Sequence, residues 1–342
     1  LHSFTLYDEI ISPSNLFLAW SEFKKDGKLK KSDVGIFAAE LEENIFALNE
    51  ELALEKYRHG GYKKFAIYDP KRRIIHKASV RNRLLHRAIF RILYPLFDKI
   101  FIFDSYSSRV GKGIHKAKKR FEQFALKISK NNSRTIYILK CDVRKFFDNI
   151  GHKILFKFLS DKIKDKKVLR LLLNIISSFE TESEKGIPLG NLTSQLFSNI
   201  YLNCFDQFVK RELRIKFYIR YADDFAIFSE EKEILENLAV TIENFLEKKL
   251  ALAIHPDKIS IRKWFQGIDF LGFVHYPNYS ILRIKTRKRI FRKVLEKKTD
   301  IVDKKLFRQT IQSYKGIMSH CRGFHTKRKI KKLVGLEYYK SK

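Results

Sequence analysis

Three aspartates stand where carboxylates could do chemistry, because each lies at the end of an apolar, β-rich segment. Asp142 stands near the end of one such run, residues 135–143, and Asp223 and Asp224 lie at the turn within residues 217–229. If these segments are neighbours in one sheet, the carboxylates face one another and repel unless divalent cations lie between them. Mg²⁺ takes oxygen ligands and is usually shared with substrate phosphates. Two such ions about 3.5–4 Å apart would clamp the attacking and leaving oxygens of a phosphoryl transfer. The alternative is an ordinary hairpin turn, in which Asp is common.

The charge of the chain indicates a polyanionic partner. Its 342 residues include 70 Lys and Arg against 38 Asp and Glu, which gives a formal net charge of +32. A chain so charged repels itself unless a polyanion neutralises part of it. Basic residues recur along the whole length instead of forming one tail, so nucleic acid is the favoured partner. An anionic membrane surface and a generally Lys-rich proteome are the alternatives.

Composition narrows the class of protein further. A hydrophobic fraction of 44% and an aromatic fraction of 14% exclude a disordered chain. No apolar run approaches the roughly 18–20 residues that span a bilayer, so we expect no membrane partner. Cys141, Cys204 and Cys321 are widely spaced and form no zinc motif. They fit a reducing compartment, and we expect a cytoplasmic protein.

The elements that must position the aspartates follow from hydrophobic periodicity and turn signals. We expect a helix over 33–54, then a basic hairpin over 65–76 that turns at Asp69-Pro70. Strands and helices follow, and three basic amphipathic helices come after Pro277, where we place a domain boundary. The expected strands are 135–143, 217–221, 225–229, 251–254, 259–263 and 268–276, and the expected helices are 80–99, 153–159, 167–179, 193–213, 231–249, 286–298, 304–320 and 326–334.

Six segments, in order, resemble the sequence boxes of reverse transcriptases. The paired aspartates lie in Tyr221-Ala222-Asp223-Asp224, similar to the YxDD box, and Asp142 lies in CDVRKFFDNI. The other boxes are residues 81–83, 105–113, 186–202 and 270–273. The resemblance covers residues 72–276.

The resemblance implies an α+β, right-hand polymerase fold with fingers, a palm and a helical thumb. The palm would be an antiparallel sheet with helices on one face. We accordingly divide the chain into an N-terminal extension (residues 1–60), fingers and palm (61–276) and a helical thumb (277–342).

The same resemblance implies an RNA-directed DNA polymerase that binds template RNA, the cDNA primer–template duplex, dNTPs and two Mg²⁺ ions. Phe147 stands at the steric gate of the family, where a ring would exclude a ribose 2′-OH. Phe146 would then face the core, since neighbours in an extended chain point to opposite sides; alternatively, both rings are core. The residues with implied catalytic and metal-binding roles are Asp142, Asp223 and Asp224, with the backbone carbonyl of Val143 as a further metal ligand.

Further roles are implied for nucleotide and primer binding. Guanidinium groups suit phosphate oxygens, so Arg73 and Arg81 are candidates to hold the triphosphate. Lys258 could protonate the leaving pyrophosphate or be a solvated surface lysine. The other implied nucleotide-binding residues are Leu189, Gly190 and Gln195, and the primer grip would contain Leu271 and Gly272.

The box at residues 186–202 departs from the usual reverse transcriptase sequence, and the departure indicates which subgroup of the family the chain resembles. Bacterial reverse transcriptases such as those of group II introns usually have Gln where Leu189 stands and Pro where Gln195 stands. Leu189-Gly190, followed by Ser194-Gln195, is similar to the signature of reverse transcriptases from diversity-generating retroelements. That likeness implies error-prone, adenine-mutagenised cDNA made from a template RNA for targeted protein diversification. It also implies a partner, a small basic helical accessory protein that forms an oligomer.

The physical interpretation of Leu189 agrees with low fidelity. A leucine offers only shape and apolar contact, which typically discriminates by about 1–3 kcal/mol. Alternatively, Leu189 merely packs the turn. Two other functions stay open: another stand-alone bacterial reverse transcriptase, for example a defence-associated one, and a non-catalytic RNA-binding scaffold with the same fold.

Overall fold

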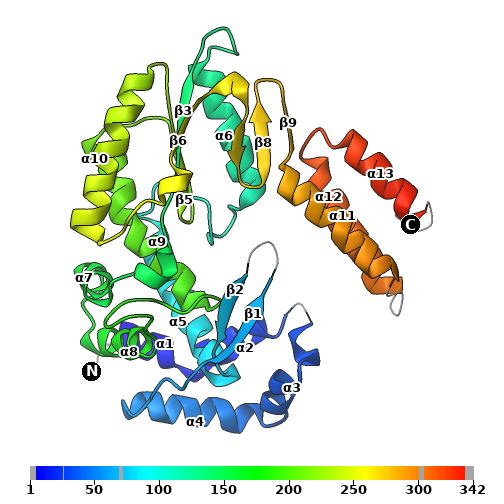
Figure 1. The fold of residues 1–342 in the computed structure, drawn as a ribbon. Helices are drawn as coiled ribbons and strands as arrows, with labels where there is room; N and C mark the ends of the chain where they lie inside the picture. The colour runs from blue at the N-terminus through cyan, green and yellow to red at the C-terminus, as the bar shows by residue number, and fades with distance from the viewer. Residues whose placement is uncertain (1–4, 26, 69–71, 300–303, 336–342) are drawn as a thin grey trace.

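The computed structural model describes residues 5–25, 27–68, 72–299 and 304–335. Figure 1 shows a lower lobe of N-terminal helices with a two-stranded hairpin, an upper lobe around a four-stranded sheet, and three C-terminal helices to the right. The turn predicted at Asp69-Pro70 lies outside the described residues.

The lower lobe is built on α5 (Val80–Asp98), which begins where the Ser79 hydroxyl accepts a hydrogen bond from the Asn82 N–H. The single helix predicted over 33–54 is wrong: Glu40 has non-helical angles (φ −118°, ψ 49°), so the segment forms two helices. The predicted hairpin is confirmed, and the helices share one hydrophobic core with the upper lobe. The elements are α1 (Leu6–Ile11), α2 (Pro13–Phe23), η1 (Lys28–Lys30), α3 (Ser32–Ala39), α4 (Leu41–Ala53), β1 (Lys63–Ile67) and β2 (Arg73–Lys77).

The upper lobe holds a four-stranded antiparallel sheet, whose strands in order are β4 (Tyr218–Tyr221), β5 (Asp224–Ser229), β3 (Tyr137–Asp142) and β6 (Ser260–Lys263). Alternate residues enter two different cores, with Leu139 and Ile227 on one face and Ile138 and Phe228 on the other. The first face packs against α9 (Leu192–Gln207) and α10 (Lys232–Leu250), and the second packs against α6 (Ile114–Ile128). The prediction of helices on one face is therefore wrong. Strands that are apolar at successive positions are typical of a sheet covered on both faces.

Most of these elements have bounds within a few residues of the predicted ones, but α6 was not predicted, and the helix predicted over 193–213 continues after Gln207 as a π-helix. The strand predicted over 251–254 is reduced to a single bridge between Ile254 and Val143, because Ala251 ends α10 in a left-handed conformation. The elements are α6 (Ile114–Ile128), β3 (Tyr137–Asp142), η2 (Phe146–Asn149), α7 (His152–Lys162), α8 (Lys166–Ile176), α9 (Leu192–Gln207), the π-helix η3 (Phe208–Glu212), β4 (Tyr218–Tyr221), β5 (Asp224–Ser229), α10 (Lys232–Leu250), η4 (Pro256–Lys258), β6 (Ser260–Lys263) and η5 (Trp264–Gln266).

A second antiparallel sheet leads to the C-terminal helices. It contains β7 (Ile268–Phe270), β8 (Phe273–Tyr276) and β9 (Tyr279–Leu282). The single strand predicted over 268–276 is a hairpin, because Leu271 and Gly272 have φ values of 54° and 84°, as a type I′ turn requires. A boundary at 276–277 would cut this sheet, so we propose to place it after β9. The thumb helices α11 (Ile284–Thr299), α12 (Lys304–Ser319) and α13 (Phe324–Val334) pack around a core that also contains Phe273 of β8 and Leu282 of β9.

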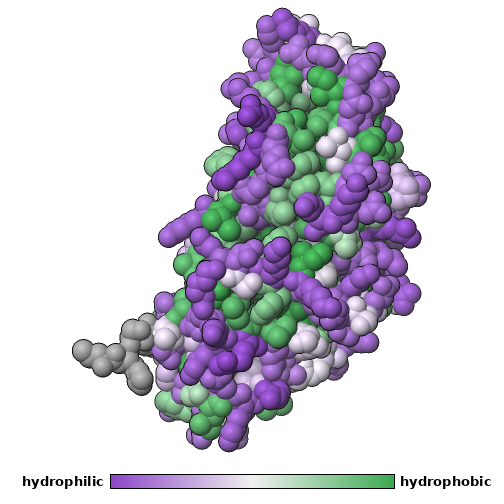
Figure 2. Space-filling model, turned by 90° about the vertical axis from the view of Figure 1, so that its left-hand side faces the viewer, coloured by the Kyte–Doolittle hydropathy of each residue, from purple (hydrophilic) through white to green (hydrophobic). Residues whose placement is uncertain are grey.

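Figure 2 shows the side of the molecule that carries α7, α8 and α10, where hydrophilic residues surround a broken band of hydrophobic ones. The exposed apolar side chains of these helices include Leu173, Ile234 and Val240. Scattered exposure of this kind is normal for a protein surface. Within the described ranges, no helix combines the length and the apolar character needed to cross a bilayer.

Candidate active site

The sheet brings the three predicted aspartates together. Asp142 is the last residue of β3 and lies directly opposite Asp224, the first residue of β5. Residues in such positions have Cβ atoms about 4.5–5.5 Å apart. Asp223 lies in the two-residue turn between β4 and β5, and its carbonyl accepts a 3.2 Å hydrogen bond from the Val143 N–H. The other turn residue, Ala222, has a φ of 55°, which lets the chain reverse within two residues.

Burial and mutual repulsion act against the charged forms of these aspartates. Burial, together with the neighbouring carboxylates of Asp142 and Asp224, raises the pKa of Asp223 to about 6, and the charge of Lys258 opposes this shift. Burial also raises the pKa of Asp224, and Lys140, whose Nζ lies 3.6 Å from Asp224 Oδ1, partly offsets this. A divalent cation between the carboxylates would remove the repulsion. The chemistry of this donor set therefore fits Mg²⁺.

Lys258 is a counterion within this group. Its ammonium donates a hydrogen bond to Asp142 Oδ1. The backbone brings it there, because the N–H of His255 donates to the Asp142 carbonyl at 2.9 Å just before η4. Lys258 is thus not simply a solvated surface lysine. Among the described residues, no three acidic, His or Cys side chains surround one point as ligands of a bound metal ion do; here lysines supply the positive charge.

The box at 186–202 forms a turn that holds the hairpin β1–β2. The Leu189 carbonyl accepts a 3.1 Å hydrogen bond from the His76 N–H, and the Asn191 side-chain amide donates to the His76 carbonyl at 2.9 Å. Gly190 has a φ of 109°, and a Cβ there would lie 2.7 Å from Ile75 Cγ2, so this approach requires glycine. Leu189 therefore lies half-buried where the fingers hairpin meets the palm.

The two arginines predicted to hold the triphosphate have different surroundings. Arg73 is exposed at the start of β2, on the same strand face as Ile75 and therefore on the side that meets Gly190. Arg81 is ion-paired with Glu51 of α4, and its guanidinium lies 4.9 Å from the centre of a tyrosine ring. Arg73 thus lies near the turn at Gly190, whereas Arg81 joins α5 to the N-terminal helices. Phosphate binding by either one stays a prediction.

Phe146 and Phe147 differ in exposure, but the reason given from the sequence is wrong. Both lie in the 3₁₀ turn η2 and not in an extended chain, because Lys145 before them has a φ of 44°. Phe146 is buried in the core, whereas Phe147 is half-buried and its carbonyl accepts a 2.9 Å hydrogen bond from the Ile187 N–H. Phe147 is therefore the ring with an accessible face, next to the turn at Leu189. Its role as a steric gate stays a prediction.

Leu271 and Gly272 form the turn between β7 and β8. The Gly272 carbonyl accepts a 3.0 Å hydrogen bond from the N–H of Arg283, the residue before α11. The Arg283 side chain also donates to Asp269 Oδ1 at 2.6 Å. The predicted primer grip is thereby attached to the start of the thumb. Gln195, also predicted to bind nucleotide, lies half-buried in the first turn of α9.

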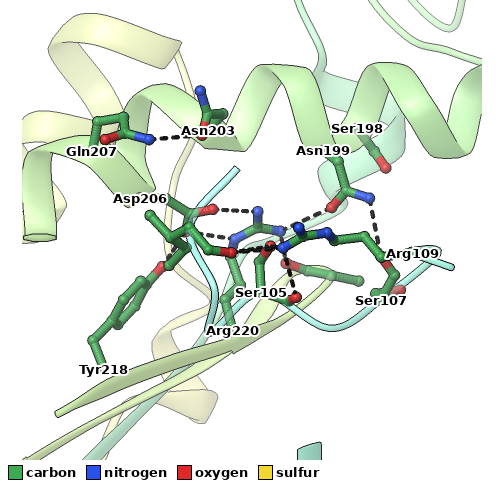
Figure 3. A network of polar contacts seen from close by, with 12 residues as sticks. Ser105, Ser107, Arg109, Ser198, Asn199, Asn203, Asp206, Gln207, Tyr218 and Arg220 are labelled. Atoms are coloured by element: carbon green, nitrogen blue, oxygen red, sulfur yellow. Dashed lines mark hydrogen bonds and ion pairs between the residues drawn. The ribbon is translucent and has the colours of Figure 1, made fainter. Parts of the chain in front are cut away.

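A buried polar network behind the turn Ala222–Asp223 was missed by the sequence reasoning. Figure 3 shows Arg220 of β4 beneath α9, with its guanidinium donating to both carboxylate oxygens of Asp206, at 2.7 and 2.5 Å. It also donates to the Ala222 carbonyl at 3.0 Å and to Asn199 Oδ1 at 3.4 Å. A signal was present in the sequence: Arg220 interrupts an apolar strand and Asp206 an apolar helix, and buried charges need partners.

Comparisons with known proteins agree with this geometry. Residues 63–275 match the family model described as reverse transcriptase (RNA-dependent DNA polymerase). The chain belongs to the reverse transcriptase family. The helices α1 to α4 precede the matched residues, and α11 to α13 follow them.

Curated relatives of the chain include three bacterial proteins. Protein YkfC of Escherichia coli (strain K12) is 27% identical over an alignment of 233 residues, and the match covers 57% of this chain and 60% of that protein. Retron Ec83 reverse transcriptase of Escherichia coli is 29% identical over 189 residues, 51% of this chain and 54% of that protein. Group II intron-encoded protein LtrA of Lactococcus lactis subsp. cremoris is 28% identical over 142 residues, 40% of this chain and 22% of that protein. The chain thus spans 60% or less of each relative.

A solved structure of apo telomerase from Candida Tropicalis aligns with 82% of this chain and 62% of that chain, at 12% identity and a TM-score of 0.49.

Proposed function

We propose that this chain is an RNA-directed DNA polymerase, which extends a primer along a template RNA with dNTPs. The observation that carries the proposal is the pairing of Asp142 with Asp224 across the sheet, beside Asp223, inside the residues that match the family. The three carboxylates and the Val143 carbonyl would hold two Mg²⁺ ions. Such ions, when bound, activate the attacking 3′-hydroxyl and stabilise charge on the leaving pyrophosphate. The three cysteines are free, which fits the cytoplasmic location that we propose.

The residues around the carboxylates would place the substrates. Lys258 lies against Asp142, from where an ammonium could donate a proton to a leaving phosphate oxygen. Phe147 has a half-buried ring that would exclude a ribose 2′-OH. Arg73 is exposed near Gly190 and suits the triphosphate. The basic helices α11 to α13 would hold the primer–template duplex through its phosphates, without reading its sequence.

We further propose the diversity-generating subtype, in which cDNA made from a template RNA carries errors at adenines and serves targeted protein diversification. The support is the sequence Leu189-Gly190, with Gln195 following, together with the hydrogen bond from His76 to the Leu189 carbonyl. This bond keeps an apolar side chain where fingers and palm meet, and apolar contacts discriminate weakly. The similarity to Retron Ec83 reverse transcriptase favours a second candidate, a stand-alone bacterial reverse transcriptase of another kind.

The partner proposed with that subtype, a small basic helical protein, has support on α4. Residues 33–55 hold seven acidic residues and no basic one, in a chain of net charge +32. Glu43, Phe46 and Glu50 are exposed at helical spacing on α4, and Phe46 is 52% exposed. Figure 1 places this helix at the lower edge of the molecule. Such a face repels phosphates and fits a basic, partly apolar protein surface.

Primer extension on an RNA template with dNTPs and Mg²⁺ tests the polymerase proposal. Wild type should extend the primer, whereas Asp142→Asn and Asp223→Asn should not, because each removes a ligand charge. Both variants should still bind the template. Asp257→Asn, which changes an exposed carboxylate next to Lys258, is the matched control and should stay active.

Extension by either catalytic variant would overturn the metal-site assignment. Failure of wild type to extend any primer, with RNA binding intact, would favour a non-catalytic RNA-binding scaffold.

A further inference from the structure

We propose that Arg220 is a positioning residue: it fixes the turn Ala222–Asp223 from behind and couples that turn to the fingers loop, residues 99–113. The inference rests on the proposed function, because it concerns the same carboxylates. It assigns a role to a residue that is 1% exposed and cannot touch substrate directly.

The turn itself needs support. Ala222 has a φ of 55°, a left-handed conformation that non-glycine residues rarely adopt and that persists when surrounding contacts hold it. Arg220 donates to the carbonyl of that same residue at 3.0 Å. The carbonyl belongs to the peptide group that leads into Asp223. The hydrogen bond therefore fixes the orientation of the peptide from which the catalytic carboxylate projects.

The guanidinium is itself held rigidly. Asp206, which is 0% exposed, accepts from it through both carboxylate oxygens, and the Tyr218 hydroxyl donates to Asp206 Oδ1 at 2.7 Å. The nearby negative charge of Asp206 outweighs burial and raises the pKa of Arg220, so the side chain stays charged. Arginine suits this place because its planar fork can bond a carboxylate and a carbonyl at once, which an ammonium cannot do with the same geometry.

Arg220 also connects the turn to the fingers loop. Its guanidinium donates to Asn199, whose amide in turn donates to the Ser107 carbonyl at 2.9 Å, as Figure 3 shows. The backbone adds two bonds of 3.0 Å, from the Arg220 N–H to the Asp104 carbonyl and from the Tyr106 N–H to the Arg220 carbonyl. One residue thus contacts α9, the fingers loop and the catalytic turn. A displacement of the loop would be transmitted to Asp223 through these bonds.

Arg220→Lys tests the role because it keeps a positive charge opposite Asp206 but loses the fork. We expect Mn²⁺ affinity of the protein–duplex complex, measured by electron paramagnetic resonance, to fall about 10- to 100-fold, as it does when partners of metal ligands are changed. The Mg²⁺ concentration for half-maximal extension should rise in parallel. Duplex affinity at fixed salt should change by less than about twofold, because phosphate contacts determine it.

Arg109→Lys is the matched control. Arg109 is the other guanidinium drawn in Figure 3, and it donates to Asp98 of α5 and to the Ser105 carbonyl and hydroxyl in the fingers loop. Its hydrogen bonds within the described residues do not reach the turn Ala222–Asp223. Its variant should melt at a lower temperature but lose much less Mn²⁺ affinity than Arg220→Lys, because the bonds of Arg220 to Asp206 and to the Ala222 carbonyl stay intact. An equal loss of Mn²⁺ affinity in both variants would overturn the proposed route through the turn.

If Arg220 has only a structural role, Arg220→Lys should have a lower melting temperature but wild-type Mn²⁺ affinity. That result would overturn the proposal. If Arg220→Lys does not fold, the test uses Asn199→Ala, which leaves the ion pair of Arg220 and Asp206 intact. Weaker Mn²⁺ binding by this variant supports the proposal, and unchanged binding refutes it. An inactive wild type would refute the proposed function, whereas an active wild type with an unaffected Arg220→Lys would refute the positioning role alone.

Discussion

Replacing Asp223 by Asn should stabilise the protein while it abolishes DNA synthesis. The Asp223 carboxylate lies beside those of Asp142 and Asp224, and its pKa is raised from 3.8 to about 6. At neutral pH the folded protein therefore carries this charge at a cost. Asparagine has nearly the same shape without the charge, so one substitution removes both the repulsion and the ligand.

The size and sign of the effect follow from the pKa shift. A rise from 3.8 to about 6 corresponds to about 3 kcal/mol. Because folding raises the pKa of Asp223, the contribution of this residue to stability is fully present below the unfolded-state pKa of 3.8, where the carboxyl is protonated in both states. That part of the unfolding free energy is lost as the pH rises through about 6 and the buried carboxyl ionises. The asparagine variant does not suffer that loss. Its advantage in unfolding free energy should be small near pH 4 and about 1–3 kcal/mol near pH 8, or about 1–4 °C in melting temperature for a chain of 342 residues.

Thermal unfolding in EDTA, at a series of pH values from acidic to mildly alkaline, measures this effect. Asp142→Asn is the contrasting control: it leaves Lys258 without its partner, so it should not stabilise the protein at any of these pH values. Mg²⁺ should narrow the gap between wild type and Asp223→Asn, because a ligand that binds the folded state stabilises it. A variant that melts at or below wild type at pH 8, or a difference independent of pH, would refute the reasoning.

Four further predictions concern substrates and partners. Phe147→Ala should raise ribonucleotide incorporation in extension assays; a larger effect from Phe146→Ala would reverse the two rings. Leu189→Gln should lower misincorporation opposite template adenine by about 2- to 12-fold, because one added hydrogen bond contributes about 0.5–1.5 kcal/mol. Sequencing of the cDNA measures this, and equal error rates would mean that another residue causes the infidelity. Affinity for primer–template should fall about 10³- to 10⁵-fold between about 50 and 200 mM salt if 6–10 phosphates are contacted; a flat response would assign the positive charge to another partner. A synthetic Lys/Leu amphipathic helix should bind wild type, by fluorescence anisotropy, and lose affinity when Glu43 and Glu50 are both changed to Lys; equal binding would exclude α4 as the docking face.

That the three aspartates of the proposed active site lie together could be predicted from the sequence, because several local signals agree there. Asp142 and Asp224 each adjoin an apolar strand, and Ala222–Asp223 leaves room for only a tight turn between two strands. Neighbouring strands joined by so short a turn must be antiparallel. These local signals do not say that β3 pairs with β5, which was inferred from the order of the reverse transcriptase boxes. The register of that pair places Asp142 opposite Asp224.

Other features were beyond prediction because they depend on contacts between distant segments. The ion pair of Lys258 with Asp142 depends on where η4 docks, and the pairing of Arg81 with Glu51 on how the N-terminal helices pack. The hairpin at Leu271-Gly272 was missed because Leu is an unusual residue at positive φ, where turns favour Asn or Gly. The helices on both faces of the sheet, in contrast, were open to prediction, because strands that are apolar at successive positions indicate a sheet covered on both faces.

The charge distribution explains why a paired arginine, and not a single lysine, lies behind the catalytic turn. The chain has a net charge of +32, which draws phosphates to its surface, yet the proposed reaction centre is acidic. There, Asp142, Asp223 and Asp224 face Lys140 and Lys258, which leaves one net negative charge that repels a triphosphate but attracts divalent cations. A lone buried cation behind the turn would compete with those ions for the carboxylates. Because Asp206 neutralises Arg220, the pair can hold the Ala222 carbonyl without weakening the attraction of the site for metal.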